Sequence, residues 1–95
     1  MRLSKGSYDY ARERKRILTT DEGQDVLARM RDWVQRAIKT SGAFRMQEAT
    51  LRVSPLDMWL ALASVERLLE LDEIAEVPRT CWPQYRIFTS PKVNN

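Results

Sequence analysis

Apolar residues recur at helical spacing along the first half of the chain, and their clearest run lies between residues 21 and 39. One face of this run carries apolar side chains three or four positions apart: Val26, Met30, Trp33 and Ala37. Thr19 and Glu22 have the spacing of a capping box before the run, and Gly42 follows it as a stop signal. The pattern predicts an amphipathic helix over residues 21–39.

Shorter elements follow this helix. Residues 43–46 suit a short bridging strand, and residues 47–53 suit a short second helix. Ser54 and Pro55 favour the start of a third helix, because serine is a good N-cap and proline fits the first helical position. We expect this third helix over residues 55–71. Its predicted core stripe is Met58, Leu62, Val65 and Leu69.

The C-terminal part changes to the pattern of a β-hairpin. Residues 74–77 and 85–89 are the predicted strands, and Pro83 limits the shape of the loop between them. Residues 91–95 are expected to form a flexible tail. Residues 1–18, before the first long helix, are expected to form a basic arm or a short helix.

The order of these elements resembles the winged helix-turn-helix superfamily over roughly residues 20–90. The most telling stretch is SVERLLELDEI, residues 64–74, which resembles the end of a third helix, a tight turn and the apolar residue that opens the wing. The resemblance implies a mostly α-helical fold with a C-terminal β-hairpin: a winged-helix-like three-helix domain over residues 19–90, with the basic arm before it.

Two features depart from the family pattern. The turn at Asp72 and Glu73 lacks the glycine often found there. The N-terminal half of the third helix, residues 56–63, contains no arginine, lysine, asparagine or glutamine. These are the side chains with which DNA-binding members contact base edges in the major groove. If DNA is bound at all, we expect little discrimination between sequences.

Charge is distributed unevenly along the chain, whose formal net charge is +3. Residues 1–16 hold six basic and two acidic residues, a net charge of +4, and residues 79–95 hold three basic residues and no acid. Residues 54–78 hold six acids and one arginine, a net charge of −5. Basic segments suit phosphates, so the predicted nucleic-acid-binding residues are Arg12, Arg14, Lys15, Arg16, Arg79, Gln84 and Arg86. The open alternatives for the arm are a solvated terminus and contact with an acidic protein.

The residue inventory favours a protein without catalysis, cofactor or metal. There is no histidine, and Cys81 is the only cysteine, so the commonest general base and an intrachain disulfide are both excluded. No nucleophile–base pair, phosphate-binding loop or metal-ligand cluster is visible. No apolar run approaches the roughly 18 residues of a membrane span, and no signal peptide is recognisable. We therefore expect a cytoplasmic protein that does not enter a membrane.

The third helix has more apolar side chains than its core stripe needs, and a helix that is apolar nearly all round is buried on more than one side. The predicted protein-interface residues are Leu56, Trp59, Leu60, Ala63 and Trp82. Trp59 in particular is expected in an interface and not in the intramolecular core. The alternative for Trp82 is packing under the hairpin. The alternative for the helix is that the N-terminal segment folds across it, through Tyr8, Tyr10, Ile17 and Leu18.

Two functions follow from these patterns. The first is an accessory or regulatory factor of nucleic-acid metabolism, for example in transcription, in which the arm and wing contact phosphates and the third helix contacts protein. The alternative is a winged-helix adaptor or inhibitor that binds a protein partner and not DNA. A homodimer through the third helix is compatible with both.

Overall fold

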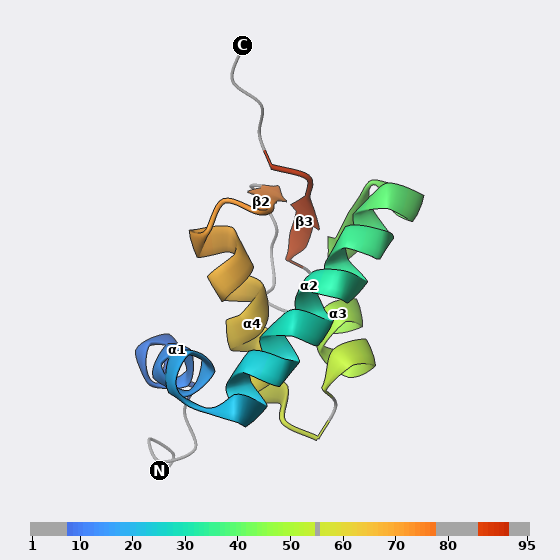
Figure 1. The fold of residues 1–95 in the computed structure, drawn as a ribbon. Helices are drawn as coiled ribbons and strands as arrows, with labels where there is room; N and C mark the ends of the chain where they lie inside the picture. Colours follow the sequence, from blue (N-terminus) through green and yellow to red (C-terminus); the bar gives the residue numbers. More distant parts are fainter. Residues whose placement is uncertain (1–7, 55, 78–85, 92–95) are drawn as a thin grey trace.

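The computed structural model describes residues 8–54, 56–77 and 86–91, within which four helices pack together and a small antiparallel sheet lies at one end of them (Figure 1). In chain order the elements are α1 (Tyr10–Thr19), α2 (Asp21–Ser41), β1 (Ala43–Arg45), α3 (Met46–Val53), α4 (Met58–Glu70), β2 (Ala75–Val77) and β3 (Ile87–Thr89). The mostly helical fold is confirmed. The basic arm is helical over α1, and the first predicted helix is two residues longer at its C-terminus.

Helices α1 and α2 meet at a single residue, Thr20. Its backbone N–H donates to the Arg16 carbonyl at 3.0 Å, which ends α1. Its hydroxyl accepts from the backbone N–H of Gly23 at 2.9 Å, so Thr20, and not the predicted Thr19, is the N-cap of α2. At the other end of α2, Gly42 has a φ of 83°, the left-handed conformation that glycine adopts most readily.

Helix α4 begins three residues later than predicted. Its N-cap is Asp57, whose carboxylate accepts from the backbone N–H of Leu60 at 3.1 Å. Ser54, the predicted N-cap, is instead the residue that ends α3. Beyond α4, Asp72 has a φ of 61° and takes the left-handed position in the turn, which accounts for the missing glycine.

The sheet joins the predicted hairpin to the bridging strand. The strand order is β1-β3-β2, and both pairings are antiparallel. Phe88, in the central strand, is opposite Phe44 of β1 and Glu76 of β2. The Phe88 side chain is fully buried and stacks on Phe44, while Trp33 of α2 meets Phe44 edge-on. The sheet therefore closes one end of the core (Figure 1).

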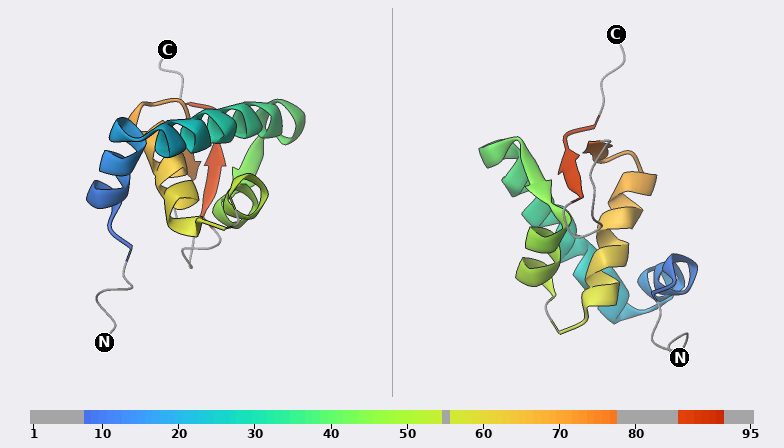
Figure 2. Two further views of the ribbon diagram at one scale, coloured as in Figure 1. Left: turned by 60° about the horizontal axis from the view of Figure 1, so that its bottom comes forward. Right: turned by 180° about the vertical axis from the view of Figure 1, so that it is seen from behind.

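Three helices surround α4 (Figure 2). Its buried residues are Leu60, Ala61, Ala63, Ser64, Val65 and Leu68. The predicted core stripe is therefore wrong in phase: of its members only Val65 is buried, while Met58 is 41% exposed and Leu62 and Leu69 are partly buried. The physical reason is that α1, α2 and α3 cover α4 from different sides, so its buried arc is wider than one apolar stripe.

Candidate functional site

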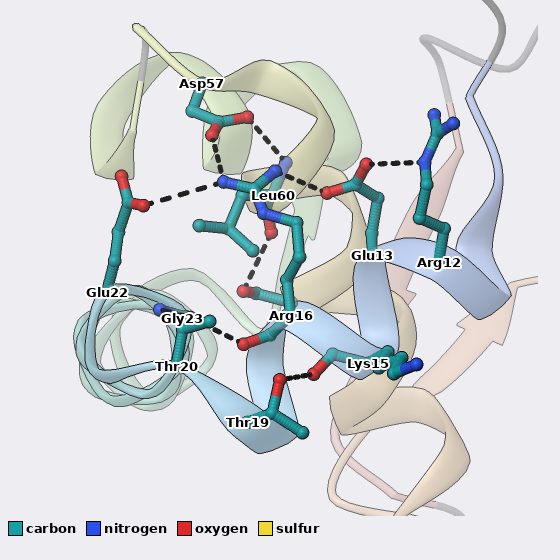
Figure 3. A network of polar contacts seen from close by, with 11 residues as sticks. Arg12, Glu13, Lys15, Arg16, Thr19, Thr20, Glu22, Gly23, Asp57 and Leu60 are labelled. Atoms are coloured by element: carbon teal, nitrogen blue, oxygen red, sulfur yellow. Dashed lines mark hydrogen bonds and ion pairs between the residues drawn. The ribbon is translucent and has the colours of Figure 1, made fainter.

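Arg16, a predicted phosphate contact, lies at the centre of a network of ion pairs within the chain (Figure 3). Its guanidinium donates to Glu13 of α1 at 2.6 Å and to Asp57 at the start of α4 at 2.9 Å, and Glu22 of α2 lies 3.6 Å away. Glu13 is only 2% exposed. The hydrogen bond to Asp57, followed by that to Glu13, raises the pKa of Arg16 further above its ordinary value. This arginine joins three helices.

A second ion-pair cluster lies at the C-terminal end of α4, around Glu70. Arg14 of α1 pairs with its carboxylate at 2.8 Å, and the Tyr10 hydroxyl and Arg67 each donate to it at 2.8 Å. The hydrogen bonds from Tyr10 and Arg67 lower the pKa of Glu70. Burial and the hydrogen bond to Glu70 raise the pKa of Tyr10 to about 12. Polar groups of α1 thus contact α4 near both of its ends.

Between these clusters α1 covers Trp59. The Arg12 guanidinium lies 5.7 Å from the centre of the indole ring and pairs with Glu13 at 3.5 Å. Trp59 is partly buried within its own chain. The alternative in which the N-terminal segment crosses the third helix is confirmed: Ile17 is buried, and Tyr8 and Tyr10 pack on the core, although Leu18 is exposed.

Arg86 is the only predicted wing contact among the described residues, because Arg79, Trp82 and Gln84 lie outside them. Arg86 makes two hydrogen bonds to Glu76 of β2, at 2.8 and 2.9 Å, and a longer one to Glu66 of α4 at 3.3 Å. The paired guanidinium lowers the pKa of Glu76. Like Arg14 and Arg16, this arginine contacts the acidic segment of its own chain.

The exposed basic side chains that form no ion pair within the described part of the chain are Lys15, Lys39, Arg45 and Arg52. Of these only Lys15 belongs to the predicted set. Sequence reasoning missed the others because they lie in the central part of the chain, where no run of basic residues distinguishes them.

The predicted protein interface is only partly at the surface. Leu60 and Ala63 are fully buried, so their assignment to an interface is wrong, because the buried arc of α4 includes them. Leu56 is 99% exposed, and it lies in the turn between α3 and α4. Leu51 and Met58, on either side of this turn, are 51% and 41% exposed. We call these three residues the α3–α4 corner.

No protein family, curated protein or solved structure matches the chain. Among the described residues, no group of three or more histidine, cysteine, aspartate or glutamate side chains could hold a metal ion. No helix in the same part of the chain has the length and apolar character needed to cross a bilayer.

Proposed function

We propose that this chain is a non-enzymatic winged-helix module that docks onto another protein. The order α2-β1-α3-α4-β2-β3 and the pairing of β2 with β3 support the winged-helix part of this proposal. The absence of histidine and the single cysteine in the sequence support the non-enzymatic part. The choice of protein over DNA depends on how the arginines are used.

The observation that carries the proposal is the pairing of Arg16 with Glu13 and Asp57. If Arg16 turned to a phosphate, the Glu13 carboxylate would lose its closest cation while it remained buried. Leaving a buried charge without its partner is strongly destabilising. Arg86 faces a related cost, because its partners Glu76 and Glu66 are partly buried. The cost for Arg14 is smaller, because its partner Glu70 is exposed and also pairs with Arg67.

The outward surface of α4 and the turn before it supports a protein partner. Leu56 and Met58 are exposed there, and Leu51 at the end of α3 completes the exposed apolar set of the α3–α4 corner. Large apolar side chains in water mark docking surfaces when they occur together.

The test is photo-crosslinking from the α3–α4 corner in an extract of the source cells. A benzoylphenylalanine residue placed at position 56 should form adducts that protease removes and nuclease leaves intact. The matched control is the same residue at Gln24, which is exposed in α2. Adducts that nuclease digests, or equal adducts from both positions, contradict the proposal.

A second candidate function is nucleic-acid binding through the unpaired cations Lys15, Lys39, Arg45 and Arg52. Fluorescence anisotropy with generic duplex DNA at low salt distinguishes the two proposals. Protein docking predicts no saturable DNA binding. Binding that falls steeply with salt, and falls again in the double variant Lys39→Glu, Arg45→Glu, favours the second candidate.

A further inference from the structure

Helices α2 and α3 line an open groove made of two adjoining shallow hollows, of about 330 and 340 Å³. Both hollows are lined by Trp33 and Arg36 of α2 and by Arg52 of α3. Arg29 and Asp32 line one end, and Glu48 lines the other. Each volume lies at the lower end of the roughly 300–1,000 Å³ of ligand pockets, which suits one or two side chains of a partner.

We propose that this α2–α3 groove binds a short acidic segment of a partner protein that carries one large apolar side chain. The inference rests on the proposed protein-binding function and assigns a surface and a partner chemistry to it. Tryptophan and arginine, the residues common to both hollows, are the types that contribute most to protein interfaces.

The cations of the groove are available to a carboxylate. Arg52 forms no ion pair within the described residues. Arg36 pairs with Asp32 one turn earlier in α2, at 2.8 Å, and both side chains are well exposed. Exposed pairs of this kind contribute little to stability, so a partner carboxylate can replace Asp32 at small cost. The planar guanidinium groups favour carboxylates through paired hydrogen bonds.

Trp33 supplies the apolar part of the site. Its ring packs on the buried Phe44 in a T-shaped arrangement with 5.5 Å between centroids, so the core holds one side of the indole. The rest of the side chain is partly exposed and lines both hollows. A rigid aromatic surface flanked by cations suits an apolar side chain between two acids.

Two other occupants fit this groove less well. Asp32 and Glu48 line the two ends of the groove, so the continuous charge of a phosphate backbone would run past both acids, whereas a short segment can place its acids at Arg36 and Arg52, which line both hollows. A second copy of this chain offers Leu71, which is exposed between acids, but Glu70 and Glu73 near it are already paired with Arg14 and Arg31 of the same chain, which leaves Asp72 as its one unpaired acidic neighbour among the described residues. An acidic segment of a different protein therefore matches the groove best.

The test selects peptides with the intact chain as bait. The probe is a phage-displayed library of random twelve-residue peptides, and the most enriched peptide is synthesised with a fluorescent label. We expect enriched sequences in which acids flank one aromatic or leucine residue. Arg52→Glu should weaken binding of that peptide by at least about tenfold. Thr40 is exposed and lines one hollow. Thr40→Trp should therefore weaken peptide binding to a similar extent by filling this hollow, without a change of charge.

The matched control is Lys15→Glu, which makes the same charge reversal on α1 and should change affinity by less than about twofold. Circular dichroism checks that each variant keeps its thermal midpoint. In a nitrogen–proton spectrum, the indole N–H signal of Trp33 should move when the peptide binds, and that of Trp59 should not. Equal affinity for all variants, or no acidic enrichment, overturns the proposal.

Two further outcomes assign the groove to other occupants and also overturn it. One is duplex DNA binding that Arg52→Glu abolishes, and the other is a dimer in sedimentation experiments that the same substitution dissociates. If the selection fails while position 56 still forms protein adducts, only the groove is refuted. If both fail, the protein-docking function itself is refuted.

Discussion

Helix α4 is held by two flanks of different chemistry. On the side of α1, the N-cap Asp57 pairs with Arg16 (Figure 3), and Glu70 at the other end of the helix pairs with Arg14. The rest of its buried surface is apolar apart from Ser64, and it shares one core with α2, α3 and Ile17 of α1. The role of a basic segment therefore depends on the acidic segments of its own chain. Here opposite charges meet between helices, and the arm becomes part of the domain.

The two flanks should respond differently to substitution. Apolar burial depends weakly on salt and pH, whereas pairs of partly exposed charges are screened by salt and depend on ionisation. Breaking the apolar flank should unfold the whole domain. Breaking the charged flank should loosen α1 while α2, α3 and α4 stay folded.

The largest expected effect comes from Leu60→Ala. Leu60 is fully buried, and removing its side chain leaves a cavity that costs about 3 kcal/mol of unfolding free energy. Denaturant unfolding followed by circular dichroism measures the loss. The control is Leu56→Ala, which changes an almost fully exposed leucine and should alter stability by less than about 0.5 kcal/mol. Similar losses for both variants would contradict the assignment of the core.

An intermediate effect is expected from Asp57→Ala. The substitution removes both the cap on the Leu60 N–H and the ion pair with Arg16, and should cost about 1–2 kcal/mol. Asp57→Asn keeps an acceptor for the cap and removes the charge. In the Asp57→Asn variant, amide hydrogens of α1 should exchange faster than those of α4. If Asp57→Asn leaves exchange in α1 unchanged, the ion pair does not hold the flank.

Helices α2 and α4 differ in how well the sequence predicts them. The long helix α2 was predicted with its glycine stop, because its apolar face and terminal signals are local in sequence. The phase of α4 was wrong, since Leu60, Leu62 and Ala63 give it apolar side chains around most of its circumference. Which of them is buried depends on three helices that come from elsewhere in the chain.

The sequence identifies the arginines of the candidate site but does not predict that they pair with carboxylates of the same chain. The density of arginines before residue 17 is visible in the sequence, but Arg16 is 41 positions from Asp57 and Arg14 is 56 positions from Glu70. No periodic pattern connects residues so far apart. The only available signal was the complementary net charge of the two segments, which predicts attraction without specifying pairs.

The smallest expected effect concerns alkaline pH at Tyr10. Its pKa is raised to about 12, whereas a tyrosine in the unfolded chain titrates near 10. This raised pKa adds to the free energy of unfolding. The added stability is fully present below about pH 10 and is lost as pH rises towards 12, because the unfolded state then binds fewer protons than the folded state. Partial solvent exposure keeps it below about 1 kcal/mol. The stability difference between the native chain and Tyr10→Phe should be smaller at pH 11 than at pH 8. A difference independent of pH contradicts the Tyr10–Glu70 hydrogen bond.

The position of β3 in the centre of the sheet has a consequence for the order in which the molecule assembles. Phe44 and Phe88 are paired although 44 positions separate them, and β1 and β2 make no pair with each other. While the ribosome makes the chain, the helices can form from local contacts, but both outer strands wait for residues 87–89. Until then each outer strand has a backbone edge that can pair with another chain. Chains stopped before β3 should therefore aggregate, because the last strand to be synthesised is the one that satisfies the other two.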